Sequence, residues 1–305
     1  MKKHAFLIFA HKQPNLMGRT IRRLEAENHY FFIHVDKKTK NYSDFKLAVK
    51  DIPNVFFHED RFAVYHAGSS HLLATLALMR DVIRLVPDYD YIHIISAQDY
   101  PLRSNEQFDA FFENTSHSFM YLDEEELHNK NINYLKRGVN EFHFNRTSTT
   151  LAKIYEKLRL GSIIALFYKR APIKNLHGGW DWYSWNKKVL DAFMQYINQN
   201  PQYLKRFNHT VCPTEKIVQT FVCDKTEQLE IETTNPLRYI SWHAHRPVDT
   251  DYRPFTLTEQ DYDFIIDSKA FFCRKVDEIE SAKLLDMIDE QRGSEYDINE
   301  HSNYV

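Results

Sequence analysis

Short apolar runs alternate with segments of helical spacing through the first 125 residues. The runs are brief, rich in Phe, Ile, Val and Tyr, and bounded by polar residues, which is typical of strands. Two other segments, 14–28 and 69–86, repeat their apolar residues every three or four positions, which is the period of a helix. The predicted strands are 4–11, 30–36, 54–59, 91–99 and 118–123.

This alternation predicts an α/β fold with a Rossmann-like, mostly parallel central sheet that has helices on both faces. The second half of the chain is less regular. Helices are predicted near 149–160, 187–199 and 214–224, and short strands near 178–185, 237–242 and 271–275. No stretch has the composition of a flexible linker, and no internal repeat is present, so we expect one domain.

Polar residues end four of the predicted strands. They are His11, Asp36 and Glu59 in the first three, and Asp99 at the end of the apolar run of YIHIISAQDYPLRS (91–104). In open α/β sheets, ligands bind beyond the carboxyl ends of the strands. We therefore expect His11, Asp36, Glu59 and Asp99 to lie near one rim of the sheet.

Composition narrows the class of protein. The chain has 305 residues, 43% of them hydrophobic and 27% charged, which suits a folded domain of this size. Its formal net charge of -3 gives no reason to expect nucleic acid as a partner. Three cysteines without a CxxC pattern indicate neither a disulfide framework nor a structural zinc site. No apolar run approaches the roughly 18 to 20 residues of a membrane span, so we expect a cytoplasmic protein.

Several common chemistries lack their sequence signatures. The chain contains no GxGxxG, GxxxxGK[ST], GxSxG or HExxH, and its 16 histidines show no spacing typical of metal ligands. Asp-x-Asp, which can hold a divalent metal in sugar-nucleotide transferases, occurs as DYD at 88–90 and 261–263 and as DTD at 249–251. The first precedes its strand and the other two fall in a loop region. A metal site built on Asp88 and Asp90 is therefore a disfavoured alternative.

Six motifs occur in a fixed order along the chain. They are IHVDKK (33–38), VYHAGSSHLLATLALMRDVIR (64–84), YIHIISAQDYPLRS (91–104), GGWDWYSW (178–185), CPTEKIVQTFV (212–222) and AFFCRKVD (270–277). In order and spacing, over roughly 3–280, the chain resembles the core-2/I-branching β-1,6-N-acetylglucosaminyltransferase and peptide O-xylosyltransferase family. The resemblance implies a GT-A fold, inverting transfer of a sugar from a UDP-sugar, and no divalent metal or other cofactor.

The resemblance also implies residue roles for the reaction. The catalytic base falls on Glu215 in the triplet PTE, where the family's middle Asp is replaced by Thr214. The cations that bind the leaving diphosphate fall on Arg253 and Lys275, with Arg274 as an additional cation. A carboxylate at a helix start stays ionised in the field of the helix dipole, and Arg and Lys can stabilise a departing diphosphate without a metal.

Further residues are expected around the two substrates. His11, Asp36 and Tyr65 are assigned to the nucleotide. Trp180, Asp181 and Trp182 are assigned by resemblance to the sugar pocket, since a Trp face stacks on a pyranose. Asp99 and Tyr100 are assigned to the acceptor side, with the alternative that Asp99 only braces its loop. Turn-forming aspartates and packed aromatic residues remain the structural alternatives for the others.

The resemblance divides the expected domain by role. Residues 1–280 form a single GT-A catalytic domain, with a nucleotide-binding half of about 1–125 and an acceptor and catalytic half of about 126–280. Residues 281–305 form a helical, acidic C-terminal tail. Between 134 and 174, nine Lys or Arg stand against two acidic residues. We hypothesise that this segment contacts a membrane surface or a lipid-linked acceptor; the alternative is a helix with a charged outer face.

The sequence therefore predicts a bacterial-type, metal-independent inverting glycosyltransferase. N-acetylglucosamine is the favoured donor sugar, β-1,6 the linkage by analogy, and a free or lipid-linked glycan of a growing polysaccharide the acceptor. Xylosyl or hexosyl transfer on the same fold is one alternative, and a non-catalytic nucleotide- or carbohydrate-binding protein is another. The predicted location is the cytoplasm, with peripheral contact at the inner face of the membrane.

Overall fold

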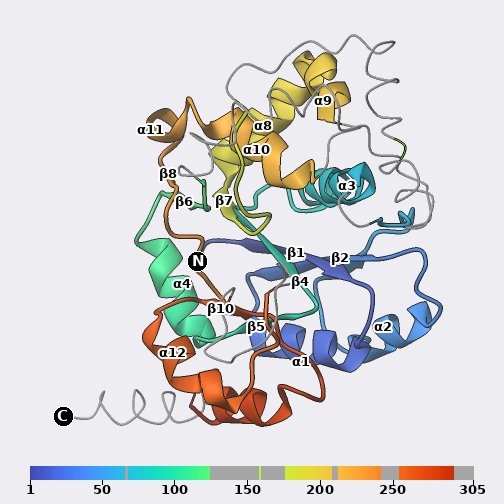
Figure 1. Cartoon of the computed structure of the whole chain (residues 1–305), viewed down its shortest axis with the longest axis vertical. Helices are drawn as coiled ribbons and strands as arrows, with labels where there is room; N and C mark the ends of the chain where they lie inside the picture. The colour runs from blue at the N-terminus through green and yellow to red at the C-terminus, as the bar shows by residue number, and fades with distance from the viewer. Residues whose placement is uncertain (66–67, 124–157, 159–175, 208–211, 242–253, 292–305) are drawn as a thin grey trace.

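The computed structural model describes residues 1–65, 68–123, 158, 176–207, 212–241 and 254–291 (Figure 1). Its larger sheet has the strand order β3-β2-β1-β4-β7-β6-β8. The strands are β1 (His4–Ala10), β2 (His29–Val35), β3 (Val55–Phe57), β4 (Tyr91–Ser96), β6 (Ser118–Phe119), β7 (Ser184–Asn186) and β8 (Ile231–Glu232). Strands β3, β2, β1 and β4 are parallel neighbours, and β7 pairs antiparallel to β4 and β6. The predicted α/β class and mostly parallel sheet are confirmed.

The two-residue period of β1 divides the core into two layers. Ala5 and Leu7 pack on one face of the sheet, and Phe6 and Ile8 on the other. The first face is covered by α3 (Ser69–Leu85), α8 (Lys187–Gln199), α9 (Pro201–Phe207) and α10 (Thr214–Val222). The second is covered by α1 (Pro14–Leu24), α2 (Tyr42–Ala48) and α4 (Asn105–Glu113) (Figure 1). The large helices therefore lie on both faces, as predicted.

A smaller sheet packs beside the first one. It contains β5 (Asp99–Pro101), β10 (Phe272–Arg274) and β9 (Arg238–Ile240). The short elements α11 (Thr226–Leu229), η1 (Glu259–Asp261) and α12 (Tyr262–Asp267) complete the described part, together with a helix at 282–291. That last helix buries Leu284, Leu285 and Ile288 in a third core cluster with Tyr100 and Cys273. The described part of the predicted tail is thus packed against the domain.

Some predicted boundaries are wrong. The strand predicted at 91–99 ends at Ser96, and Asp99 begins a strand of the other sheet. The strands predicted at 118–123 and 178–185 shrink to the two residues of β6 and to β7, although Leu122 and Gly179 still form a bridge. The helices predicted at 187–199 and 214–224 are α8 and α10. The helix predicted at 149–160 lies outside the described residues, apart from Leu158.

The sequence also predicted that the cysteines form no disulfide framework and that no segment spans a membrane. All three cysteines are free, as their spacing predicted. Among the helices that the structure describes, none is both long and apolar enough to cross a bilayer.

Candidate functional site

The carboxyl ends of β1, β2 and β4 meet at one edge of the larger sheet, as parallel pairing requires. His11 follows β1 and Asp36 follows β2, where the Asp36 backbone N–H donates to the Ala10 carbonyl over 2.8 Å. Ser96 ends β4 and leads into Asp99. The structure therefore brings His11, Asp36 and Asp99 of the predicted rim to the same edge. Glu59, two residues beyond β3, is exposed and pairs with Lys46 over 3.6 Å.

Asp36 organises the corner assigned to the nucleotide. Its carboxylate accepts hydrogen bonds from the backbone N–H of Lys38 at 2.9 Å and of Val64 at 3.3 Å. The Lys38 ammonium lies 3.5 Å from the second Asp36 oxygen and 4.7 Å from the centre of the Tyr65 ring. These contacts hold the segment before α3 against the end of β2. Asp36 and Tyr65 consequently share one corner with a cation that the sequence reading did not assign.

His11 faces the same corner. Burial lowers the pKa of its imidazole, and the neighbouring charge of Lys12 lowers it further, while Asp36 acts in the opposite direction. Lys275 and Lys38 also lower this pKa, so both ammonium groups are near the ring. Lys275 follows β10 in the chain, and its backbone carbonyl accepts from the Leu257 N–H at 2.8 Å. The predicted nucleotide residues and one predicted diphosphate cation thus converge.

Arg274 and Asp99 form a close ion pair at the edge. The two residues are register partners in the antiparallel pairing of β10 with β5. Arg274 Nη1 lies 2.8 Å from Asp99 Oδ1 and 3.0 Å from Oδ2, and 3.1 Å from Ser96 Oγ. The side chains are 13% and 3% exposed. The Asp99 carboxylate also accepts from the Ser96 N–H, so it orients Arg274 and closes the turn after β4.

Arg274 also faces the segment 178–185. Its guanidinium carbon lies 3.8 Å from the centre of the Trp182 ring, within cation–π range. Its charge counters the effect of burial on Asp181, whose pKa burial raises to about 6. His71 Nδ1 of α3 lies 3.8 Å from the Asp181 carboxylate. Burial and the positive charge of Arg274 lower the pKa of His71 to about 4, which favours its neutral form at neutral pH.

A small cavity of about 10 Å³ lies beside Asp181 and is lined by residues of α3, β4, α8 and α10. The polar residues of its wall are His71, Thr75, Asp181, Tyr183 and Thr214; the others are apolar. The Thr214 hydroxyl donates to the Asp181 carboxylate, which lowers the raised pKa somewhat. Asp181 is therefore connected both to Arg274 and to the first turn of α10.

Glu215 is exposed in that first turn. The Gly179 N–H donates to its backbone carbonyl at 3.1 Å, and Gln219 Nε2, one turn further on, donates to the Trp180 carbonyl at 2.9 Å. A Cβ on Gly179 would lie 2.1 Å from the Tyr121 carbonyl oxygen, so only glycine permits this close approach. The Cys212 thiol hydrogen-bonds to the Glu215 carboxylate, and its own pKa is raised to about 12, mainly by burial.

Trp180 and Tyr100 differ in their surroundings. Trp180 is partly exposed and its ring packs 4.5 Å from that of Tyr121, centre to centre. Tyr100 is fully buried in the third core cluster. Its hydroxyl donates to Asp289 at 2.7 Å and accepts from Arg19 Nε at 3.1 Å. Tyr100 is thus a packing residue here, whereas Trp180 borders the first turn of α10.

Two predictions fall on the undescribed parts of the chain. Arg253 lies outside the described residues, and so does the basic segment 134–174 except for Leu158. Of the three Asp-x-Asp matches, 249–251 also lies outside the described residues. Asp88 of the first match pairs with Lys3 at 2.5 Å before β4, at the opposite edge of the sheet from the candidate site.

The sequence reading missed four polar residues that complete the site: Lys38, His71, Ser96 and Thr214. Each stands inside a motif that the resemblance used, but none had a chemical signal of its own. Arg238 was also missed. It is buried, and donates to the carbonyls of Ile94 at 3.1 Å and Tyr183 at 3.3 Å, so it joins β4 to the segment before β7.

The seven-stranded, mostly parallel sheet with helices on both faces is consistent with a GT-A-like α/β fold. The family model described as Core-2/I-Branching enzyme matches residues 4–266, and the chain belongs to this family.

Three curated relatives carry related names. The chain is 25% identical to a xylosyltransferase from Ciona intestinalis over 77% of its own length and 27% of the relative's. It is 24% identical to xylosyltransferase 1 from Rattus norvegicus, over 93% and 35%. It is also 24% identical to xylosyltransferase 2 from Pan troglodytes, over 89% and 32%. The chain thus spans about a third of the length of these relatives.

Proposed function

We propose that the chain is a glycosyltransferase that moves a sugar from a UDP-sugar to a hydroxyl of a glycan acceptor. The observation that carries the proposal is the link between two predicted groups through Asp181. Asp181 and Thr214, the residue before Glu215, line the same small cavity, and the guanidinium of Arg274 stacks 3.8 Å from the ring of Trp182, the residue after Asp181. The base and the cations that the reaction needs are therefore attached to one small polar cluster.

In this proposal Glu215 takes the proton of the acceptor hydroxyl as its oxygen forms a bond to the anomeric carbon. The bond between that carbon and the β-phosphate oxygen breaks on the opposite face, and UDP leaves with the electron pair, which inverts the anomeric centre. Lys275 and Arg274 neutralise the charge that develops on the diphosphate. Arg253 is assigned the same role by family match alone. A divalent metal is not required for these steps.

Asp99 acts in this scheme by holding Arg274. A guanidinium that is already oriented by a carboxylate and stacked on Trp182 needs little rearrangement to meet a phosphate. His11, Lys38 and Tyr65 surround the nucleotide beside Asp36. The neutral His71 and Trp182 border the sugar.

The donor sugar is proposed as N-acetylglucosamine, in line with the branching-enzyme family. Xylose is the second candidate, because the relatives reported above are named xylosyltransferases. Release of UDP from UDP-N-acetylglucosamine, UDP-xylose, UDP-glucose and UDP-galactose, each with a panel of glycan acceptors, separates the two. UDP release from none of the four donors would contradict the proposal.

Glu215→Gln tests the base. This variant should bind UDP as the wild type does, measured by calorimetry, but should transfer sugar about 100-fold to 10,000-fold more slowly. Glu227→Gln is the matched control, because Glu227 is also an exposed glutamate in the first turn of a helix. Unchanged transfer by Glu215→Gln would remove this residue from the mechanism. Normal UDP binding without turnover by the wild type would favour a non-catalytic binding protein.

Lys275→Met tests the diphosphate site. We expect roughly 10-fold to 100-fold weaker UDP binding, since a charge-assisted contact to phosphate contributes about 1.5 to 3 kcal/mol. Lys283→Met, which removes a lysine that is 72% exposed, is the control. UDP affinity within twofold of the wild type in Lys275→Met would exclude the proposed contact.

A further inference from the structure

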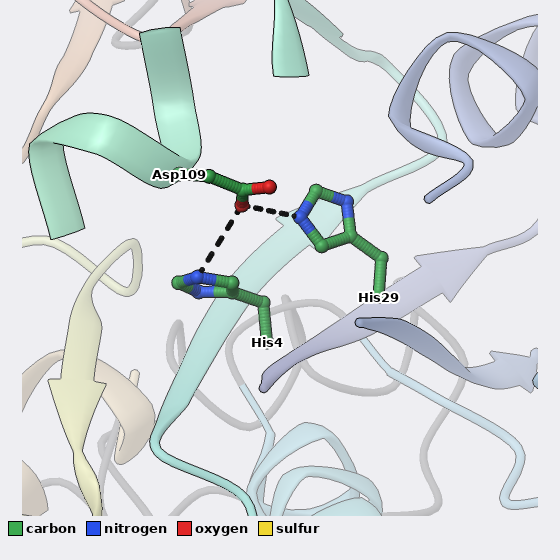
Figure 2. Close-up of side chains that lie close together, drawn as sticks. All are labelled: His4, His29 and Asp109. Carbon is green, nitrogen blue, oxygen red and sulfur yellow. Dashed lines mark hydrogen bonds and ion pairs between the residues drawn. The ribbon is translucent and has the colours of Figure 1, made fainter. Parts of the chain in front are cut away.

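A group of histidines stands at the opposite edge of the larger sheet from the candidate site. His4 begins β1 and His29 begins β2, and the two are register partners in a parallel pair. Their side chains therefore point to the same face of the sheet, the face that α4 covers. Asp109 extends from α4 toward both imidazole rings (Figure 2).

The three side chains present their donor atoms to one point. His29 Nε2 lies 2.9 Å from Asp109 Oδ1, and His4 Nε2 lies 3.6 Å from the same oxygen. All three ligand atoms fall within 4.8 Å of one another. Both imidazoles are fully buried, whereas the Asp109 carboxylate is 15% exposed. The cluster is thus enclosed on the sheet side, and of its three side chains only the Asp109 carboxylate reaches solvent.

Hydrogen bonds behind His29 determine which nitrogen faces the carboxylate. His29 Nδ1 lies 2.5 Å from the Leu24 carbonyl, which can only accept, so Nδ1 carries the proton. In the neutral ring, Nε2 then directs a lone pair at an Asp109 oxygen that also carries lone pairs. The same oxygen accepts from Asn28 Nδ2 at 3.2 Å. A proton or a metal ion between His29 Nε2 and this oxygen would remove the repulsion of the two lone pairs.

His4 has the same kind of support. Its Nδ1 lies 3.0 Å from His93 Nε2, and His93 Nδ1 lies 2.9 Å from Ser184 Oγ. Ser184 Oγ accepts from Arg238 at 3.1 Å. If each imidazole donates from Nδ1 along this chain, the His4 Nε2 lone pair is left facing the cluster. No hydrogen-bond partner for this buried nitrogen occurs among the described residues.

We propose that His4, His29 and Asp109 bind a zinc ion that ties β1, β2 and α4 together. Two imidazoles and a carboxylate are ligands that zinc prefers, and a water molecule would complete a tetrahedral site. Tetrahedral bonds of about 2.0 to 2.2 Å place ligand atoms roughly 3.3 to 3.5 Å apart. The separations of 2.9 and 3.6 Å lie on either side of this value.

The surroundings favour a structural role for the ion. Both imidazole ligands are fully buried between the sheet and α4. Ligated histidines commonly donate their other nitrogen to a fixed acceptor, as His29 does to Leu24 and His4 can do to His93. The rings of Phe108 and Phe112 pack 5.1 and 5.3 Å from that of His4. The proposed ligands are at positions 4, 29 and 109. They are too far apart in the sequence to form a short metal-binding motif, so the sequence alone does not predict the site.

Metal analysis and titration of the full-length protein test the proposal. The protein as purified should contain about one zinc per chain. After treatment with a chelator and its removal, ZnCl₂ should bind with 1:1 stoichiometry and micromolar or tighter Kd, and should raise Tm by a few degrees. CoCl₂ should give the strong visible absorption of a tetrahedral site. A weak, octahedral cobalt spectrum, or no 1:1 zinc event, would overturn the proposal.

Variants locate the ion. Asp109→Asn and His29→Gln should each weaken zinc binding at least 10-fold. Asp81→Asn is the matched control, because Asp81 also contacts a histidine, with His58 Nδ1 at 2.6 Å, and its carboxylate is likewise 15% exposed. Zinc affinity within twofold of the wild type in Asp109→Asn would exclude the site. If these variants do not fold, zinc-edge anomalous diffraction from wild-type crystals decides: a peak among the three side chains supports the site, and a peak elsewhere or none excludes it.

Discussion

At the scale of single residues, the best-defined interaction of the candidate site is the ion pair between Arg274 and Asp99. Both side chains are largely buried, so removal of one partner leaves an uncompensated charge. We expect Asp99→Asn to destabilise the protein by about 3 kcal/mol. Urea unfolding of Asp99→Asn, Arg274→Gln and the double variant measures the coupling.

The double variant should cost clearly less than the sum of the two single ones. A comparable cycle on Lys187 and Asp191, which lie 3.1 Å apart at an exposed i,i+4 position of α8, should show coupling of about 0.5 kcal/mol or less. Equal coupling in both cycles would mean that the Arg274 pair contributes no more than a surface contact.

Asp181 gives a prediction about pH. Burial raises its pKa from 3.8 to about 6, so between these values the folded protein binds more protons than the unfolded chain. The free energy of unfolding therefore falls as pH rises through this window, by up to about 3 kcal/mol. Asp181→Asn should remove this contribution, so its stability relative to the wild type should be higher at pH 7 than at pH 4.5.

Urea denaturation at pH 4.5, 5.5 and 7.0 checks the slope. Asp263→Asn, an exposed aspartate replaced in the same way, should not change the pH dependence relative to the wild type. A difference between Asp181→Asn and the wild type that is the same at all three pH values would contradict the assigned cause.

Much of the rim was predictable, because parallel strands place the residues that follow them at one edge. His11, Asp36 and Asp99 lie there for this reason. The partners of these residues were not predictable. Asp99 contacts Arg274 only because β5 pairs with β10, which lies about 175 positions further along the chain. The sequence of a single motif does not indicate which distant strand it pairs with.

At the scale of elements, α4 shows how a helix can be missed and still be well specified. Ser104 Oγ accepts from the Gln107 N–H at 3.2 Å, and Gln107 Oε1 accepts from the Ser104 N–H at 3.3 Å, which is a capping box. The signal S-x-x-Q stands at 104–107 in the sequence. No helix was predicted there, because the apolar residues of 105–113 are few and the segment is short.

Ser104→Ala should destabilise the protein by about 1 kcal/mol, because the N–H of Gln107 loses its acceptor. Thermal unfolding followed by circular dichroism measures the change. Ser43→Ala, which removes an exposed hydroxyl from the first turn of α2, should change stability by less than about 0.5 kcal/mol. Equal effects of the two substitutions would show that the capping box contributes nothing.

The strand predicted at 91–99 was too long: a strand is present there, but it ends at Ser96. Its residues are buried on both faces through Ile95, so the apolar run gave no period from which to place its end. The break at Ser96 comes from tertiary pairing, since β5 is drawn into the other sheet. The apolar pattern therefore predicted the central strand β4 correctly. It could not predict that the chain leaves the larger sheet after Ser96 and enters the smaller sheet at Asp99.

At the scale of the whole molecule, the C-terminal helix at 282–291 belongs to the folded domain. Leu285 is 1% exposed in the third core cluster, and Asp289 binds Arg19, Arg23 and the Tyr100 hydroxyl. Leu285→Ala should destabilise the protein by about 2 to 5 kcal/mol. Lys283→Ala, on the exposed side, should cost less than about 0.5 kcal/mol. Urea unfolding compares them, and similar values would show that this helix is only loosely attached.

The two proposed sites lie at opposite ends of the same strands, which allows their metal dependence to be separated. From His4 to the end of β1 the chain rises by roughly 20 Å, at about 3.3 Å a residue. A zinc ion at His4 should therefore affect folding stability and leave the charges around Arg274 and Lys275 unchanged. We expect chelation to lower Tm of the wild type and not that of Asp109→Asn.

Sugar transfer measured well below Tm should in contrast be the same with and without the chelator, in both proteins. If chelation also abolished sugar transfer in Asp109→Asn, the metal responsible would lie at the transfer site. This result would contradict metal-free transfer but would not bear on the proposed zinc site. A loss confined to the wild type, at a temperature where the chelated protein is still folded, would show that the ion acts across the sheet on the catalytic edge.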